Sequence, residues 1–231
     1  SIKELKYPTF HWSGEYKNDM AQAITHKTDF QINEHYDWEI KNSHQNPDVL
    51  LLCNNDPNIQ KRILEQTNAK TIAMDTMNLW INIEKEMLDY VVSQVNILFI
   101  NDLEAQIYSN EIDLDYAAEK LLDKGPKHVI IKKGEHGASL YTNQFVKHLN
   151  AFKVENFVDP TGAGDSFAGA VMGYLANKEN IRTNDIIIAM NYGAAVASIT
   201  VEGFGTESII TITNKEIERR FRKLNGGPGR I

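Results

Sequence analysis

The sequence predicts a doubly wound α/β domain, in which a mostly parallel sheet is covered by helices on both faces. Three observations predict it. Short runs that are apolar throughout alternate with segments whose apolar residues recur at helical spacing. Runs of this kind are typical of strands buried on both faces. The chain has 231 residues, of which 42% are hydrophobic and 24% charged, so it is long and apolar enough to enclose the core of such a domain.

The alternation of strands and helices begins near residue 48. The first apolar run, residues 48–53, precedes the helix-start signal Asp56-Pro57, after which Ile59, Ile63 and Leu64 recur at helical spacing. Further strands are expected at 70–74, 97–100 and 128–132. Helices are expected at 83–92, 103–108 and 114–122.

The pattern changes after residue 137. Two short alternating segments, 138–142 and 144–149, predict an antiparallel hairpin that turns at Asn143. Helices are then expected at 164–176, 183–200 and 214–224. The first 45 residues are aromatic and β-branched without helical periodicity, which predicts edge strands or a small second sheet. We therefore expect three parts: residues 1–45, a main domain at 46–224 and a flexible tail at 225–231.

Composition excludes several classes of protein. Lys plus Arg number 24 and Asp plus Glu 31, so the formal charge is −7, which argues against binding to nucleic acid or to an anionic membrane. The single cysteine, Cys53, excludes an internal disulfide framework, and its apolar setting predicts a buried, inert thiol. No apolar run approaches the ~18 residues of a membrane span, and the first residues lack the apolar core of a signal peptide. We expect a cytoplasmic protein.

Polar residues follow each predicted strand of the main domain. They are Asn54, Asn55, Asp75, Asn101, Lys132 and Lys133. Ligands of open α/β sheets bind outside the carboxyl ends of the strands. The sequence therefore predicts a polar crevice along one edge of the sheet.

The most informative segment is residues 159–170, in which Gly162-Ala163-Gly164 leads directly into a predicted helix. A glycine turn at a helix start presents unpaired amides and the positive end of the helix dipole, which favours an anion. Asp165 would repel a phosphate there, but it makes chemical sense as the acceptor of a proton from a hydroxyl that attacks that phosphate. The alternative is an ordinary helix-start aspartate beside glycines that serve only the turn.

Other nucleotide motifs are absent from the chain. A dinucleotide-binding Gly-x-Gly-x-x-Gly would need glycine at position 167, which is Phe167. No P-loop or nucleophile-elbow pattern occurs, and the seven histidines form no metal-ligand pair at helical spacing. A nicotinamide-dependent oxidoreductase is therefore an alternative supported only by the sheet type.

The string from Asp159 to Phe167 resembles the C-terminal signature of the ribokinase-type carbohydrate kinases, the pfkB family. Three further segments resemble that family in the same order over roughly residues 48–215: the Asn-x-x-Glu element at 101–104, the strand and Gly-x-x-Gly turn at 130–138, and the helix and loop at 189–206. The resemblance implies a ribokinase-like sheet flanked by helices with a small, partial β lid. Residues 9–16 and 28–32 resemble lid strands.

The resemblance implies ATP-dependent transfer of the γ-phosphate to a hydroxyl of a sugar or nucleoside. Asp165 would be the general base, and Gly162, Ala163 and Gly164 would supply an anion hole. Asn101 and Glu104 would hold Mg²⁺, partly through water. The alternative for Glu104 is an acidic side chain exposed to solvent on an amphipathic helix. The remaining residues expected to bind the nucleotide are Lys133, Gly134, Gly137, Thr161 and Asn191. Asp159 and Thr161 would line a monovalent-cation site, as in some relatives.

Two departures from the family pattern bear on function. The family's first strand, with its Gly-Gly and Asn motifs for the acceptor, has no counterpart here, so we expect a truncated chain. Residues 75–80 replace the commoner Asp-x-Asn-x-Arg. One alternative is therefore an inactive nucleotide-binding fragment, and a homodimer formed through the lid or an exposed sheet edge is a further expectation.

Overall fold

The computed structural model describes residues 4–16, 23–36 and 38–226 of the chain. It forms two compact units, Ser1–Ile40 and Lys41–Ile231. In the first, strands β1 (His11–Tyr16) and β2 (Ala23–Asp29) pair antiparallel and the short helix α1 (Gln31–His35) follows. The expected lid strand at 28–32 is thus wrong in its second half, because Ile32 lies in α1. The end of the expected tail, 227–231, lies outside the described residues.

The second unit contains a six-stranded mixed sheet, as the sequence predicted. Its strands are β3 (Val49–Leu52), β4 (Thr71–Asp75), β5 (Ile97–Asn101), β6 (His128–Lys132), β7 (Ala138–Tyr141) and β8 (Val146–Leu149). Their order in the sheet follows the chain. Strands β3 to β6 are parallel, and β7 and β8 add the expected antiparallel hairpin.

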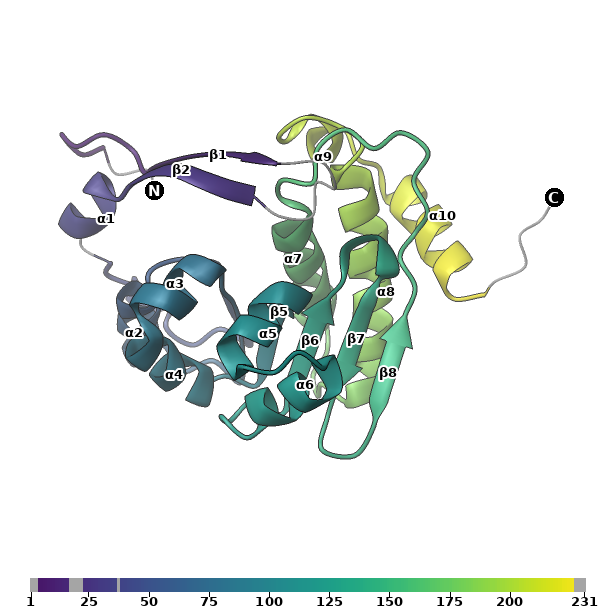
Figure 1. The fold of residues 1–231 in the computed structure, drawn as a ribbon, viewed down its shortest axis with the longest axis horizontal. Helices are drawn as coiled ribbons and strands as arrows, with labels where there is room; N and C mark the ends of the chain where they lie inside the picture. Colours follow the sequence, from purple (N-terminus) through teal and green to yellow (C-terminus); the bar gives the residue numbers. More distant parts are fainter. Residues whose placement is uncertain (1–3, 17–22, 37, 227–231) are drawn as a thin grey trace. The chain divides into compact units, whose positions relative to one another are not determined.

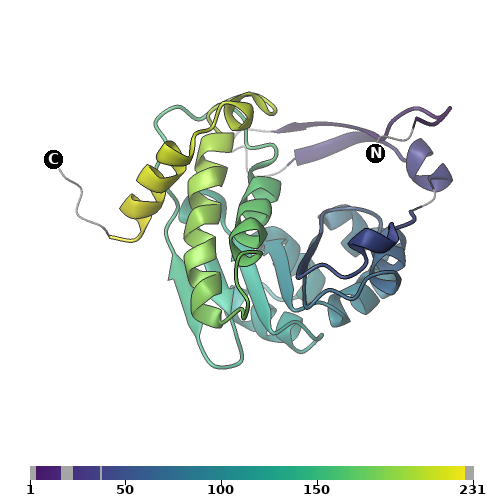
Figure 2. The same cartoon turned by 180° about the vertical axis from the view of Figure 1, so that it is seen from behind.

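Helices cover both faces of this sheet (Figures 1 and 2). One layer consists of α2 (Pro57–Glu65), α3 (Asn78–Ile83), α4 (Lys85–Ser93), α5 (Asp102–Ser109) and α6 (Leu114–Leu122). The other contains α7 (Ala163–Leu175) and α8 (Thr183–Thr200), followed by α9 (Glu207–Ile210) and α10 (Asn214–Leu224). Short 3-10 turns lie at Asn42–His44 and Gly134–His136. Within the described part of the chain, no helix is long and apolar enough to cross a membrane.

Two apolar cores confirm that the sheet is buried on both faces. In β5, Leu98 and Ile100 pack into the core under the α2–α6 layer, whereas Ile97 and Phe99 pack against α7 and α8. All four side chains are buried. This alternation along one strand is the reason that the run reads as apolar throughout.

The helix expected at 83–92 is confirmed as α4, which begins at Lys85. The short helix α3, which ends at Ile83, is a separate element that the sequence analysis does not predict. Glu84 between them has φ −130° and ψ 35°, which lies outside the helical region. Glu84 therefore separates the expected helix from the shorter helix before it.

Cys53 also differs from the prediction. Strand β3 ends at Leu52, and the Cys53 side chain is exposed beyond the carboxyl end of the strand. Partial burial of the thiol, together with the nearby negative charges of Asp165 and Asp75, raises the pKa of Cys53. The expectation of a buried thiol is therefore wrong, but a raised pKa leaves less of the reactive thiolate.

Asp89 joins three elements of one helical layer, and we expect it to make stability depend on pH. Burial opposes its charge, but hydrogen bonds from Lys124, Lys85 and Tyr108 outweigh burial and lower its pKa to about 2 from 3.8. This contribution is complete above the unfolded pKa of 3.8 and is lost as the pH falls toward 2, because the unfolded chain then binds the proton first.

The measurement is the urea midpoint of the wild type and of Asp89→Asn from about pH 5 to about pH 3. The wild-type midpoint should fall more steeply than that of the variant. Parallel curves would contradict the role given to Asp89.

Candidate active site

The parallel strands bring their polar end residues to one edge of the sheet, as expected. Asp75 ends β4, Asn101 ends β5 and Lys132 ends β6. Asn101 pairs with Lys132, and Asp75 pairs with Phe99, two residues before the end of β5. Helix α7 begins with Ala163 and packs against β3 and β4. The edge therefore gathers residues from four segments that are far apart in the sequence.

A buried ion pair spans the end of the sheet between β4 and β6. The Nζ of Lys132 lies 2.6 Å from Oδ2 of Asp75, and the two side chains are 17% and 6% exposed. Burial disfavours the ammonium, but the carboxylates of Asp75, Glu104 and Asp165 outweigh it and raise the pKa of Lys132. Lys132 therefore remains an ammonium at neutral pH.

Helix α7 begins at a left-handed glycine. Gly162 has φ 81° and ψ −2°, a conformation that favours glycine, and its carbonyl accepts the amide of Ser166 at 2.9 Å. The amide of Ala163 turns back to the carbonyl of Pro160 at 3.1 Å, so it is not free for a ligand. The amides of Gly164 and Asp165 have no backbone partner within the described residues.

The ammonium of Lys132 lies directly beside this helix start. A Cβ built on Gly164 would stand 3.1 Å from Nζ of Lys132. Two positive features thus converge: the amide end of α7 and a buried ammonium. The sequence analysis predicted Lys132 at the polar edge but assigned it no role. No local sequence signal indicates that the last side chain of β6 extends toward residue 164.

The end of α8 supports the turn before α7. The amides of Val158 and Asp159 both donate to the carbonyl of Val201, at 2.8 and 3.3 Å. Within the turn, the amide of Thr161 donates to the carboxylate of Asp159 at 2.9 Å. These bonds fix the path of the chain into the glycine turn.

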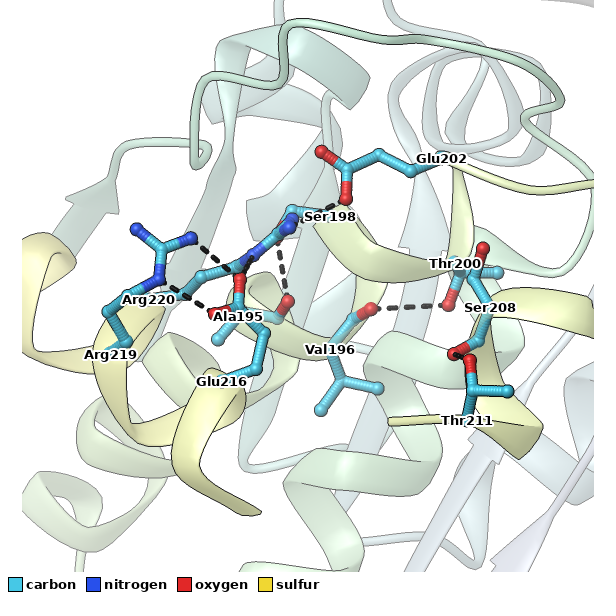
Figure 3. Close-up of polar contacts among 10 residues, drawn as sticks. All are labelled: Ala195, Val196, Ser198, Thr200, Glu202, Ser208, Thr211, Glu216, Arg219 and Arg220. Atoms are coloured by element: carbon cyan, nitrogen blue, oxygen red, sulfur yellow. Dashed lines mark hydrogen bonds and ion pairs between the residues drawn. The ribbon is translucent and has the colours of Figure 1, made fainter. Parts of the chain in front are cut away.

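Arg220 of α10 in turn anchors the end of α8 (Figure 3). Its guanidinium donates to Glu202 at 2.6 Å, to Glu216 at 2.7 Å and to Ser198 at 3.0 Å. Arg220 is 6% exposed, so this charge is buried and satisfied on three sides. The network holds the segment after α8, which belongs to the 189–206 stretch that resembles the family.

Asn101 and Glu104 form a reciprocal capping box at the start of α5. The Asn101 side chain accepts the amide of Glu104 at 2.7 Å, and the Glu104 carboxylate accepts the amide of Asn101 at 3.0 Å. Glu104 is 8% exposed rather than solvated. Burial raises its pKa to about 7, with Lys132 and the Asn101 amide acting in the opposite direction.

This capping box is compatible with the expected Mg²⁺ contact. Only one Glu104 oxygen, Oε2, is used by the cap, and a desolvated carboxylate gains from a cation. No cluster of three His, Cys, Asp or Glu that could hold a metal occurs among the described residues. Mg²⁺ characteristically takes one or two carboxylates and completes its shell with water and phosphate oxygens, so the residues fit.

Substitution at the two capping residues should separate folding from metal binding. Glu104→Gln keeps an acceptor for the Asn101 amide, so we expect little loss of stability. In the kinase reaction that the resemblance implies, it should need at least about tenfold more Mg²⁺ for half-maximal formation of ADP. Asn101→Ala removes the cap and should cost about 1 kcal/mol of unfolding free energy. Urea unfolding and a Mg²⁺ titration measure the two effects. Equal losses of stability with an unchanged Mg²⁺ requirement would assign both residues to the cap alone.

The Gly-x-x-Gly turn after β6 contains two different glycines. Gly137 has φ 83°, and a Cβ there would overlap the carbonyl oxygen of Leu149. Gly134 has φ 53° but open space around it. Lys133 is half-buried and closes the turn through its amide, which donates to the carbonyl of Gly137 at 2.8 Å. The turn is well defined, and its contact with a nucleotide stays a prediction.

Asn191, expected to border the nucleotide, lies between two helices. It is 4% exposed, and its amide donates to the carbonyl of Ile187 and to the Asn225 side chain after α10. Its neighbour Tyr192 stacks on Phe221 with ring centroids 3.9 Å apart. The described contacts of Asn191 thus fasten α10 to α8.

Asp165 stands at the third position of α7 with an exposed side chain. No described residue forms a hydrogen bond or ion pair with its carboxylate. It lies close enough to Lys132, Asp75 and Cys53 to act on their charges. The site therefore combines a free carboxylate, two unpaired amides and a buried ammonium, which together can bind an anion and accept a proton.

Comparison with known proteins places this arrangement in a family. The model of the pfkB family carbohydrate kinases matches residues 21–213. A nucleoside kinase of Methanocaldococcus jannaschii is 25% identical over 94% of this chain and 71% of its own length. A cytidine kinase of Thermococcus kodakarensis is 35% identical over 52% of this chain, and that match spans 44% of the relative.

A solved structure agrees with the fold. The crystal structure of a ribokinase from Thermotoga maritima superimposes with a TM-score of 0.72 at 25% identity, covering 94% of this chain and 71% of that one. The family match gives no support to the nicotinamide alternative. The sheet, the glycine turn at α7 and the family model agree, and the chain belongs to the pfkB family of carbohydrate kinases.

Proposed function

We propose that the protein transfers the γ-phosphate of ATP to a hydroxyl of a sugar or nucleoside. The single observation that carries this proposal is the free carboxylate of Asp165 beside the unpaired amides of α7 and the ammonium of Lys132. Residues 46–224 would form the catalytic domain and the hairpin of residues 1–45 part of a lid. The relatives named as nucleoside and cytidine kinases make nucleosides the first acceptor class to test.

In the proposed reaction, Asp165 orients the acceptor hydroxyl and accepts its proton. The acceptor oxygen bonds to the γ-phosphorus as the bond from that phosphorus to the bridging oxygen breaks, and ADP leaves with the electron pair. The amides of Gly164 and Asp165 stabilise charge on the phosphoryl oxygens. Gly162 supplies the turn that aims them, and the Ala163 amide, bonded to Pro160, gives structural support.

Mg²⁺ would neutralise charge on the ATP phosphates, and Glu104 and Asn101 are the residues that would hold it. Lys133, Gly134 and Gly137 would contact the nucleotide along the turn after β6. Asp159 and Thr161 would line the monovalent-cation site, and the bond between them gives that segment a fixed shape.

The test is ADP formation with Mg²⁺ and ATP across separate panels of nucleosides, pentoses and hexoses. We expect one panel to give turnover above the rate without acceptor. Mg·ATP binding without turnover on any panel would instead support a nucleotide-binding protein without kinase activity. No binding of Mg·ATP would contradict the proposal.

A further inference from the structure

The ion pair between Lys132 and Asp75 has no part in the proton transfer assigned to Asp165. It lies at the same edge of the sheet, and two observations link it to the place where the proposed reaction would hold a phosphate. The first is distance: Nζ of Lys132 stands 3.1 Å from the position of a Cβ on Gly164, and the amide of Gly164 has no backbone partner within the described residues. An anion held by that amide would also be within reach of the ammonium.

The second observation concerns hydrogen bonds. An ammonium has three N–H donors. Within the described residues, Nζ of Lys132 donates one bond, to Asp75 at 2.6 Å. The side chain as a whole is 17% exposed. The pair thus holds the ammonium in place and leaves it donors for a further oxygen.

The charges around the ion pair of Lys132 and Asp75 suit a role in binding phosphate. Asp75, Glu104 and Asp165 all act on Lys132, so this corner carries three carboxyl groups around one cation. Without the ammonium the carboxylates would repel the phosphates that the amides of α7 attract. A buried pair is seldom needed for stability alone, because an apolar pair of the same size often serves as well.

We propose that Lys132 is a catalytic residue that binds an oxygen of the γ-phosphate beside Gly164, and that Asp75 is the positioning residue that holds its ammonium there. The inference rests on the proposed function. Lys132 keeps its proton throughout the transfer, and the proton of the acceptor goes to Asp165. The ammonium offsets the charge on the non-bridging oxygens of the phosphoryl group as ADP departs.

The test compares binding of ADP with binding of the β,γ-imido analogue of ATP, by calorimetry in Mg²⁺. In Lys132→Met the dissociation constant of the analogue should rise about tenfold or more, whereas that of ADP should change less than about threefold, because only the analogue carries a γ-phosphate. Asp75→Asn should weaken the analogue selectively but by a smaller factor.

Two further variants keep the test decisive. Lys132→Met/Asp75→Asn removes both charges of the ion pair together and carries the test if the single variant does not fold. Lys124→Met breaks the 2.7 Å ion pair with Asp89 in the helical layer and should change neither constant. Equal weakening of both nucleotides, or of neither, in the Lys132 variants would overturn the inference. A wild type that binds neither nucleotide would contradict the proposed function itself.

Discussion

Asp165→Asn should lower turnover by about 10²–10⁴-fold, the range that a positioned general base contributes. Asparagine has nearly the same size and shape, but it cannot accept the proton of the acceptor hydroxyl. The carboxylate has no described structural partner, so its replacement should leave the unfolding free energy within about 1 kcal/mol. Steady-state kinetics with the acceptor that supports ADP formation in the panels measures the loss.

The matched control for Asp165 is Asp185→Asn, at the same third position of the neighbouring helix α8. Asp185 accepts the amide of Arg182 at 3.0 Å, and asparagine retains an acceptor there. Both variants remove one negative charge from a helix start, but only Asp165→Asn should lose turnover. Nucleotide affinity should change less than about threefold in both. Turnover that survives in Asp165→Asn would remove this residue from the role of base.

Gly137→Ala should be the most destabilising single-methyl change in the turn after β6. The residue has φ 83°, which favours glycine, and the added Cβ would overlap the carbonyl oxygen of Leu149. Because the atom that the new Cβ would meet belongs to the backbone, β8 or the turn must move. We expect a loss of more than about 3 kcal/mol of unfolding free energy, from strain and displacement together.

Gly134→Ala is the matched control three residues away in the same turn. Its φ is 53°, but a Cβ there would meet nothing within 4 Å. The cost should therefore be the left-handed conformation alone, about 1–2 kcal/mol. Urea unfolding followed by circular dichroism compares the two variants. Equal losses would show that the close approach to Leu149 does not restrict Gly137.

The fold could be predicted largely from local pattern. Apolar runs gave the four parallel strands, and the alternation after residue 137 gave the hairpin, because strand burial determines both patterns directly. Boundaries were less predictable. Cys53 lies in an apolar run typical of a strand but falls one residue beyond β3. The short helix α3 was not predicted, although α4 directly after it was.

The candidate site was predictable only where its residues are near one another in sequence. The turn at Gly162 and the carboxylate of Asp165 form one string, so their juxtaposition follows from the chain. The pair of Lys132 and Asp75 joins residues 57 positions apart on strands separated by β5, and no local signal encodes it. For Asn101 and Glu104, the sequence analysis predicted a Mg²⁺ contact but not the capping box. Asn-x-x-Glu before a helix is also a capping-box pattern.

The measurement that tests the central claim most directly is the transfer itself, followed with ATP labelled in its γ-phosphate and the acceptor that supports ADP formation. The wild type should yield phosphorylated acceptor and ADP in equal amounts, and Asp165→Asn should form both about 10²–10⁴-fold more slowly. ADP formed without labelled acceptor would indicate transfer to water. Labelled acceptor formed equally well by Asp165→Asn would contradict the assignment of this carboxylate as the base.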